Sequence, residues 1–262
     1  MPRSKQWYGC IPDYKDHRDH VMQVAAPQTL PPSVDLSRWC PPVMNQESLG
    51  SCTAHGVSGC ARWHILKRNT TYDFEMSRLQ LYYDSRMSEG TVDVDSGAMI
   101  RDVIKSVAAK GIGHEELWPY DITKFTQPPP QEVYDDAVQY KALHFSRVPV
   151  SVNGLKTALA NQHPVVIGIS VYDSFESDEV ARTGMVPMPG PNESMIGGHC
   201  MYVIGYGQKP DHFTVRNSWG DDWGDKGNCY IPFNFLGSPT YGSDYWIIDL
   251  FGSDAEQQAH TA

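Results

Sequence analysis

Residues 50–68 read GSCTAHGVSGCARWHILKR, and their spacing predicts a helix that opens with a cysteine. Apolar side chains recur every three to four residues and would line one face, at Ala54, Val57, Ala61 and Ile65. Ser51 is a suitable N-cap residue, so we expect Cys52 in the first turn of the helix. Gly56 and Gly59 are poor helix formers, and we therefore expect a neighbouring element to pack closely against them.

The chain beyond this helix divides into a helical part and a strand-rich part. Further helices are predicted at 77–87 and 98–110, and the sequence QPPPQ at 127–131 indicates a linker. Runs of β-branched and aromatic residues predict strands at 164–172, 200–207, 212–217 and 227–233, with one short helix at 153–161. This order predicts an α+β fold with two lobes and a cleft between them.

The expected divisions of the chain follow from these changes in pattern. They are an N-terminal arm at 1–29, a helical lobe at 30–140, a β-rich lobe at 141–252 and a flexible tail at 253–262. The arm is polar and contains prolines, so we expect it to have no core of its own.

Composition excludes several classes of function. The 262 residues carry a net charge of −10, which argues against a nucleic-acid partner. No apolar run reaches the roughly 18 residues of a membrane-spanning helix, so no membrane partner is expected. The first residues lack the apolar core of a secretory signal. We therefore expect a cytoplasmic protein, with secretion by another route left open.

The six cysteines stand at positions 10, 40, 52, 60, 200 and 229, and none forms a C-x-x-C pair. Their low density argues against a disulfide scaffold. Cys52 is distinctive, because the N–H groups at a helix N-terminus lower a thiol pKa and favour the nucleophilic thiolate. The alternatives for Cys52 are a small buried residue, or half of a metal site with His55.

Two later motifs offer partners for such a thiol. GGHCMYVIGYG at 197–207 places His199 immediately before a predicted strand. VRNSWGDDWGDKG at 215–227 places Asn217 at the end of the next strand, followed by Trp219. A thiol nucleophile needs a base, and the base needs an acceptor on its second nitrogen. Two adjacent antiparallel strands could bring His199 and Asn217 together, facing Cys52.

These motifs resemble those of the papain family of cysteine peptidases, in order and spacing, over about residues 30–250. Gln46 followed six residues later by Cys52 matches the family's pattern around the nucleophile, and the histidine and asparagine motifs match as well. Weaker matches are LPPSVDLSRW at 30–39 and EELWPYD at 115–121.

The resemblance implies a two-lobed α+β fold with a β-barrel-like second lobe and an active site between the lobes. It implies that Cys52 is the nucleophile, that His199 is its imidazolium partner and that Asn217 holds the imidazole. It implies an oxyanion hole formed by the Gln46 side chain and the Cys52 backbone N–H, with Trp219 shielding the His199–Asn217 bond. The implied substrate-binding residues are Gly97, Met99, Ile196 and Cys200. No metal or organic cofactor is implied.

The sequence also departs from the family pattern. Leu49 stands where secreted members carry a disulfide-forming cysteine, and DVDSG at 93–97 supplies no partner. Thr53 replaces the usual aromatic residue after the nucleophile, and GSCTA resembles the variant of bacterial and viral relatives. The family's long inhibitory pro-domain is missing, so we consider the N-terminal arm a candidate for self-inhibition in the cleft.

The predicted activity is peptide-bond hydrolysis through a thioester acyl-enzyme, with a peptide or protein as substrate. Two other functions stay open, an acyl transferase that uses the same acyl-enzyme and a catalytically silent papain-fold binding or regulatory protein. Because Gln46, Cys52, His199 and Asn217 are all present, the sequence favours an active enzyme. It leaves the natural substrate open.

Overall fold

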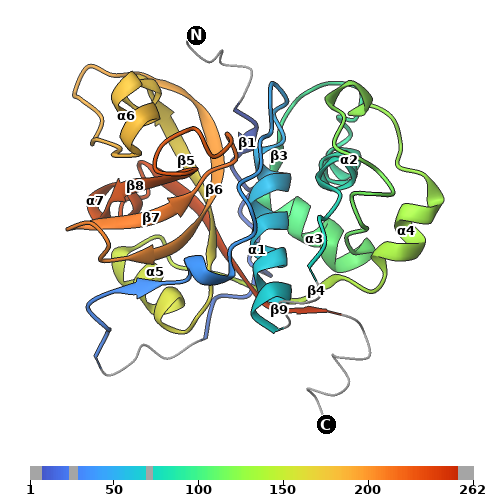
Figure 1. Ribbon diagram of the computed structural model, residues 1–262, viewed down its shortest axis with the longest axis horizontal. Helices are drawn as coiled ribbons and strands as arrows, with labels where there is room; N and C mark the ends of the chain where they lie inside the picture. The colour runs from blue at the N-terminus through green and yellow to red at the C-terminus, as the bar shows by residue number, and fades with distance from the viewer. Residues whose placement is uncertain (1–7, 24–28, 69–72, 253–262) are drawn as a thin grey trace.

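A single helix, α1 (Cys52–Arg68), stands between a helical half and a half built on a β-sheet (Figure 1). The computed structural model describes residues 8–23, 29–68 and 73–252. The helical half contains α2 (Arg78–Glu89), α3 (Ile100–Lys110) and the short α4 (Gln131–Ala137). The tail predicted at 253–262 lies outside the described residues.

Caps and glycines set the ends of these helices. Ser51 precedes α1, and its carbonyl accepts a hydrogen bond from the N–H of His55, as expected of an N-cap residue. The Ser77 side chain caps α2, and Gly90 ends that helix in the left-handed conformation. Gly111 ends α3. These three predicted helices, α1, α2 and α3, are confirmed, with boundaries that agree to about two residues. The short helix predicted at 153–161 is confirmed as well, by α5 (Val152–Ala160).

The other half is built on a seven-stranded sheet whose paired strands are antiparallel. The strands follow the order β4 (Lys141–Arg147), β9 (Gly242–Gly252), β5 (Val165–Tyr172), β6 (Met195–Tyr206), β7 (His212–Arg216) and β8 (Asn228–Pro232), and β2 (Val34–Asp35) pairs with β6. Strands β4 and β9 also contact α3, so one end of the sheet reaches the helical half.

Helix α1 packs against β6 through two glycines. A Cβ atom placed on Gly56 would lie 2.8 Å from the Cys200 sulfur, and one placed on Gly59 would lie 2.8 Å from the ring of Tyr202. Real side chains essentially never pack this closely, so only glycine allows the helix to approach the strand. The close packing predicted at both glycines is confirmed. It fixes the start of α1 beside the middle of β6.

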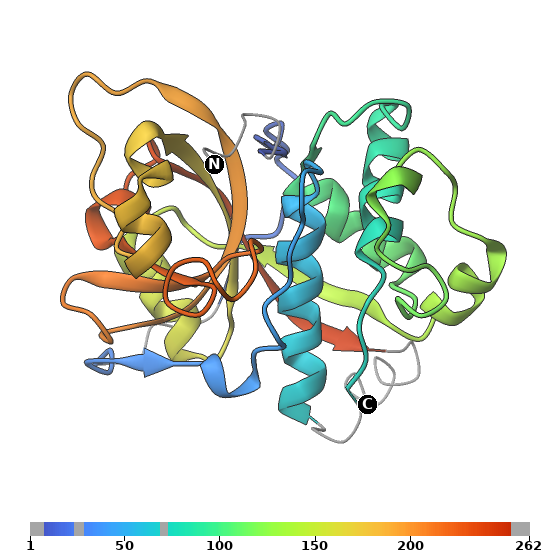
Figure 2. The same cartoon turned by 45° about the horizontal axis from the view of Figure 1, so that its top comes forward.

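Short elements complete the described chain. They are β1 (Cys10–Ile11), β3 (Ala98–Met99), α5 (Val152–Ala160), α6 (Asp178–Thr183), α7 (Phe233–Leu236) and the 3-10 helices Ser37–Trp39, Ile122–Lys124 and Asp173–Glu176. Strand β1 pairs with β3 in parallel. Figure 2 shows the first described residues entering between the two halves. Among the helices in the described part of the chain, none has the length and apolarity needed to cross a membrane.

Strand β6 differs from its prediction at the end that carries His199. The histidine was expected immediately before the strand, but the strand begins earlier, at Met195, and includes it. The preceding Gly197 and Gly198 have low strand propensity, so the sequence pattern did not predict that the strand begins before them. Glycine is needed here because the N-terminal arm packs directly on this part of the strand. A Cβ atom on Gly198 would overlap the carbonyl oxygen of Cys10.

Candidate active site

Cys52 opens α1, and its side chain is completely buried. Burial raises the pKa of the Cys52 thiol to about 12, and the neighbouring Cys10 also raises it. Hydrogen bonds from the backbone N–H groups of Cys200, Gly9 and Thr53 act in the opposite direction and lower the pKa. Because Cys200 belongs to β6 and Gly9 to the N-terminal arm, the sulfur lies where α1, the sheet and the arm meet.

The structure brings His199 and Asn217 together, as the spacing of their motifs predicts. Nε2 of His199 lies 2.8 Å from Oδ1 of Asn217. This oxygen can only accept a hydrogen bond, so Nε2 carries the proton and donates it. The pairing follows from strand register, because β6 and β7 are antiparallel neighbours and Asn217 directly follows β7. His199 is also adjacent in sequence to Cys200, whose N–H contacts the Cys52 sulfur.

Trp219 lies against the His199–Asn217 pair. Its ring stacks on the His199 ring with centroids 4.8 Å apart and an interplanar angle of 28°, and only 1% of Trp219 is exposed. A stacked aromatic ring excludes water from one face of the imidazole, and hydrogen bonds strengthen where water is excluded. Trp219 therefore covers one face of the His199 ring, and the shielding of the His199–Asn217 bond stays a prediction.

Gln46 is buried, and both ends of its side-chain amide are held. Oε1 accepts a hydrogen bond from the Ser218 hydroxyl at 2.7 Å, and Nε2 donates one to the Leu49 carbonyl at 3.0 Å. The backbone N–H of Gln46 also donates to the Ser218 carbonyl. Ser218 follows Asn217, so this loop links the glutamine to the same turn that holds the histidine partner. The orientation of the amide is fixed before any substrate binds.

The residues implied as substrate-binding lie along both sides of this centre. Gly97 has a φ of 76°, and its N–H donates to the Tyr82 hydroxyl. Met99 lies in β3, while Ile196 and Cys200 lie in β6 on the opposite side. The N-terminal arm lies between the two sides, and its Gly9 carbonyl accepts a hydrogen bond from the backbone N–H of Ala98. Ala98 is the neighbour of Gly97, and the sequence did not single it out.

His55 lies behind Cys52 and is buried. Its Nδ1 is 3.0 Å from the Ser51 carbonyl oxygen, and its ring packs edge-on against Tyr120 at 5.0 Å. Burial, together with the nearby Arg78 guanidinium, holds the pKa of His55 well below its usual value. A neutral histidine in this position supports the first turn of α1. Within the ranges that the structure describes, no group of three or more potential metal ligands occurs.

Asp95 connects the loop before the nucleophile to the helical half. Its carboxylate accepts a hydrogen bond from the N–H of Gly50 at 3.1 Å and another from the Tyr82 hydroxyl. Leu49 and the stretch 93–97 are the places where the family resemblance would have put a disulfide. A carboxylate therefore joins the same two segments without a covalent bond.

The N-terminal arm passes over Cys52. We call residues 8–11 the cover segment. The Tyr8 ring packs edge-on against His199 with centroids 5.8 Å apart, and the Gly9 carbonyl accepts a hydrogen bond from Ala98 N–H at 2.8 Å. A Cβ atom on Gly9 would overlap the carbonyl oxygen of Gly50, so only glycine fits at this point. The cover segment thus lies between β3 and β6 and separates Cys52 from solvent.

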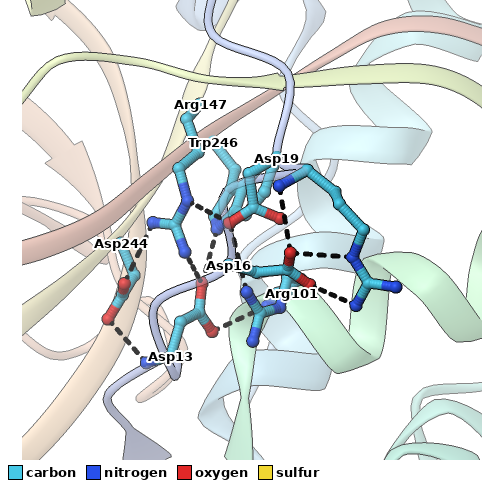
Figure 3. Close-up of polar contacts among 8 residues, drawn as sticks. Asp13, Asp16, Asp19, Arg101, Arg147, Asp244 and Trp246 are labelled. Carbon is cyan, nitrogen blue, oxygen red and sulfur yellow. Dashed lines mark hydrogen bonds and ion pairs between the residues drawn. The ribbon is translucent and has the colours of Figure 1, made fainter.

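Beyond the cover segment, residues 12–23 form an anchor segment held by a cluster of charged groups (Figure 3). We call this cluster the clamp; it consists of Asp13, Asp19, Arg101, Arg147, Asp244 and Trp246. The Asp13 carboxylate accepts hydrogen bonds from Arg147, from Trp246 Nε1 at 2.8 Å and from the backbone N–H of Arg101 at the start of α3. The side chains of Arg101 and Arg147 donate hydrogen bonds to Asp19, at 3.1 Å and 2.6 Å.

The clamp is buried and joins the arm to both halves. The side chains of Asp13, Asp19 and Arg101 are at most 8% exposed. The backbone of the anchor segment also pairs with β4, because Met22 N–H donates to the Arg147 carbonyl and Arg147 N–H to the His20 carbonyl. Removing one partner from a buried ion pair costs about 3–5 kcal/mol. The anchor segment is therefore attached more firmly than the cover segment.

Asp13 is the titrating member of the clamp near neutral pH. Burial and the adjacent Asp244 carboxylate raise the pKa of Asp13 to about 6. Hydrogen bonds from Trp246 and Arg101 and the charge of Arg147 only partly offset these effects.

Comparison with known proteins identifies the family to which this chain is similar. The sequence profile described as papain family cysteine protease matches residues 30–235. The chain is 36% identical over 213 residues to an uncharacterized peptidase C1-like protein of Acanthamoeba polyphaga mimivirus, covering 78% of this chain and 68% of that protein. It is 27% identical to human cathepsin L2 over 240 residues, covering 87% and 68% of the two chains.

Solved structures give the same result. The crystal structure of xylellain, a cysteine protease from Xylella fastidiosa, superimposes with a TM-score of 0.85 at 33% identity, covering 97% of this chain and 98% of that one. Procathepsin B S9 from Trypanosoma congolense has a TM-score of 0.73 at 18% identity, with 92% and 86% of the chains covered, and shares the fold.

Proposed function

Because the chain belongs to the papain family of cysteine proteases and is a cysteine peptidase, we propose that Cys52, His199 and Asn217 carry out its reaction. The observation that carries this proposal is the His199–Asn217 hydrogen bond under Trp219, beside a cysteine at a helix N-terminus. Because Nε2 is bonded to Asn217, Nδ1 of His199 is the nitrogen that would pair with the thiol. The Cys52 thiolate and the His199 imidazolium then form the reactive pair.

In the proposed reaction, the Cys52 thiolate attacks a peptide carbonyl carbon and forms a tetrahedral oxyanion. The oxyanion is stabilised by the Cys52 backbone N–H and by the side-chain amide of Gln46, whose orientation is fixed by Ser218 and Leu49. His199 gives its Nδ1 proton to the leaving amine, and a thioester remains. His199 then removes a proton from water, which hydrolyses the thioester and regenerates the thiol.

We also propose that the N-terminal arm inhibits the enzyme of which it is a part. The support for this is that Gly9 contacts Cys52, that Tyr8 packs on His199, and that the covered thiol has a pKa near 12. A thiol with this pKa is almost fully protonated at neutral pH and is a weak nucleophile. Displacement of the cover segment would return water to Cys52 and would open the site to a substrate.

Labelling with an epoxysuccinyl-type thiol reagent tests the assigned roles. We expect a single adduct on Cys52, located by peptide mapping, that is lost in Cys52→Ala and strongly slowed in His199→Ala. Labelling of several cysteines at similar rates would contradict an activated nucleophile. A labelled protein that hydrolyses no peptide in a substrate library but transfers acyl groups to amines would favour the acyl transferase. No adduct in any form would favour a silent binding protein.

The variant Gly9→Val tests self-inhibition. Its side chain cannot fit against the Gly50 carbonyl, so the cover segment must leave its position. We expect faster labelling of Cys52 and higher peptidase activity than in the wild type. Lys15→Val, a substitution elsewhere in the arm, is the control and should behave like the wild type. Equal labelling rates for Gly9→Val and the wild type would overturn self-inhibition but would leave the catalytic roles standing.

A further inference from the structure

We propose that Cys10 and Cys200 form a reversible disulfide that fixes the cover segment over the nucleophile. This inference rests on the self-inhibition proposed above. It adds a modification site to the arm and names the class of reagent that acts on it, a low-molecular-weight disulfide such as oxidised glutathione.

The two thiols are already in contact across the boundary between arm and sheet. Cys10 lies in β1 and Cys200 lies in β6, and interaction with the Cys200 side chain raises the pKa of the Cys10 thiol well above its usual value. Gly168 is paired with Cys200 across β5 and β6, and a Cβ atom there would lie 3.2 Å from the Cys10 sulfur. The absence of a side chain at Gly168 therefore leaves the space through which Cys10 reaches Cys200.

The structure favours this pair over the other combinations. Cys52 is also near Cys10, but its sulfur is held by the backbone N–H groups of three residues, whereas the side-chain contact of Cys10 is with Cys200. Cys229 is buried in β8, which is separated from the strand of Cys200 by β7. Among the thiols of the described chain, Cys10 is the one on the arm, and bonding it restrains the arm.

The clamp makes the disulfide favourable. Asp13 is three residues from Cys10 and is bonded to Arg147, Trp246 and Arg101, so the base of the cover segment stays attached when the segment itself lifts. A tethered group returns to its partner with an effective concentration on the order of millimolar or higher. Cys10 therefore meets Cys200 far more often than a free thiol would.

The reaction proceeds by two thiol–disulfide exchanges. When the cover segment lifts, the Cys10 thiolate attacks oxidised glutathione, which forms a Cys10–glutathione mixed disulfide and releases one glutathione thiolate. When the segment returns, the Cys200 thiolate attacks the Cys10 sulfur and releases the second glutathione. In total, two protein thiols are oxidised to one disulfide while one oxidised glutathione is reduced to two glutathione thiols. An excess of a dithiol reverses both steps.

The experiment uses full-length Cys52→Ala, which removes the competing nucleophile and needs no catalysis. The protein is incubated with oxidised glutathione and analysed by intact mass and by non-reducing peptide mapping. We expect a product that has lost two hydrogens, with a cross-linked peptide that contains Cys10 and Cys200. A protein with glutathione attached but no Cys10–Cys200 peptide, or a cross-link between other cysteines, would overturn the proposal.

Peptide binding supplies the functional measurement. Because Cys52→Ala cannot cleave, the affinity of a fluorescent substrate peptide reports how often the site is open. Oxidation should weaken that affinity by about tenfold or more, because the disulfide adds a second attachment that holds the cover segment closed until it is reduced. Dithiothreitol should restore the affinity. Cys52→Ala with Cys10→Ser should not respond to oxidised glutathione, whereas Cys52→Ala with Cys229→Ser should respond fully.

The two proposals fail in different ways. A Cys10–Cys200 disulfide that leaves peptide affinity unchanged would overturn the locking of the arm. If peptide affinity falls on oxidation while the uncovered variant Gly9→Val shows no peptidase activity under reducing conditions, the lock stands and the catalytic assignment fails.

Discussion

At the scale of single residues, Gln46, the proposed oxyanion donor, is held in position before any substrate binds. Its side-chain oxygen Oε1 accepts a hydrogen bond from the Ser218 hydroxyl. Its side-chain nitrogen Nε2 donates one to the Leu49 carbonyl, in the loop that precedes Cys52. An oxyanion hole works because its donors are already oriented, so that little reorganisation is needed when charge develops. The contribution of Gln46 should therefore be larger in the transition state than in substrate binding.

Replacing Gln46 with Ala should lower kcat by about 10²- to 10³-fold while KM changes little, because one oxyanion donor is lost. Ser218→Ala should cause a smaller fall, because the amide stays in place and loses only its orienting partner. Steady-state kinetics on a fluorogenic peptide, in the Gly9→Val background, would measure both. A rise in KM at constant kcat would show that Gln46 binds the ground state instead.

Asp13 gives the arm a dependence on pH. Its pKa is about 6 in the docked arm, above the usual 3.8, so the docked arm binds the proton more tightly than the free chain does. The contribution of Asp13 to stability is thus fully present below about pH 4 and is lost as the pH rises towards 6. We expect the wild type to lose free energy of unfolding relative to Asp13→Asn over this interval. Urea unfolding of both proteins between pH 4 and 7 would measure it, and parallel curves would contradict the raised pKa.

At the scale of elements, the sequence predicts what depends on local pattern. Helix α1, its N-terminal cysteine and the close packing at Gly56 and Gly59 could all be predicted, because apolar periodicity and helix-breaking residues are local signals. Strands β4 and β9 were not predicted. β4 carries charged and polar residues among its apolar ones, and β9 begins with Gly-Ser-Asp, so pairing in the sheet overrides weak propensity in both.

The packing of α1 on β6 predicts that Gly56→Ala changes stability in opposite directions in the wild type and in Cys200→Ala. Gly56→Ala should destabilise the wild type by about 1–3 kcal/mol, because its Cβ would overpack against the Cys200 sulfur. In Cys200→Ala the sulfur is gone, and the same substitution should stabilise by up to about 1 kcal/mol through helix propensity. Chemical unfolding of the four proteins in this cycle is the measurement. Equal effects in both backgrounds would show that another contact requires the glycine.

At the scale of the whole molecule, the arm has two parts with different attachments. The cover segment is held by backbone pairing with β3 and by Tyr8, which packs on His199 and donates a hydrogen bond to Glu176, whereas the anchor segment is held by the clamp and by β4. The aromatic and cysteine residues of the arm made it a candidate for the cleft. Its division at Pro12 could not be predicted, because Arg101, Arg147 and Asp244 lie far from Asp13 in the sequence and meet it only in the fold.

Two truncations should therefore differ. Removal of residues 1–11 should speed Cys52 labelling and leave the melting temperature nearly unchanged, because the clamp stays intact. Removal of residues 1–22 should also cost stability, by roughly 3–5 kcal/mol, since Arg101 and Arg147 lose their buried carboxylate partners. Labelling rates and unfolding curves of both truncations would decide. A large loss of stability in the shorter truncation would contradict the two-part arm.

The carboxylate of Asp95 has a consequence for how the protein reaches its native state. It ties Gly50 to Tyr82 by hydrogen bonds, at a place where no thiol has to find a partner. Formation and reshuffling of disulfides take seconds to hours, whereas hydrogen bonds form as fast as the chain itself arranges. The nucleophile can thus be set in place during synthesis, with no oxidase or isomerase on the folding route. The enzyme can mature in a strongly reducing environment as readily as in an oxidising one.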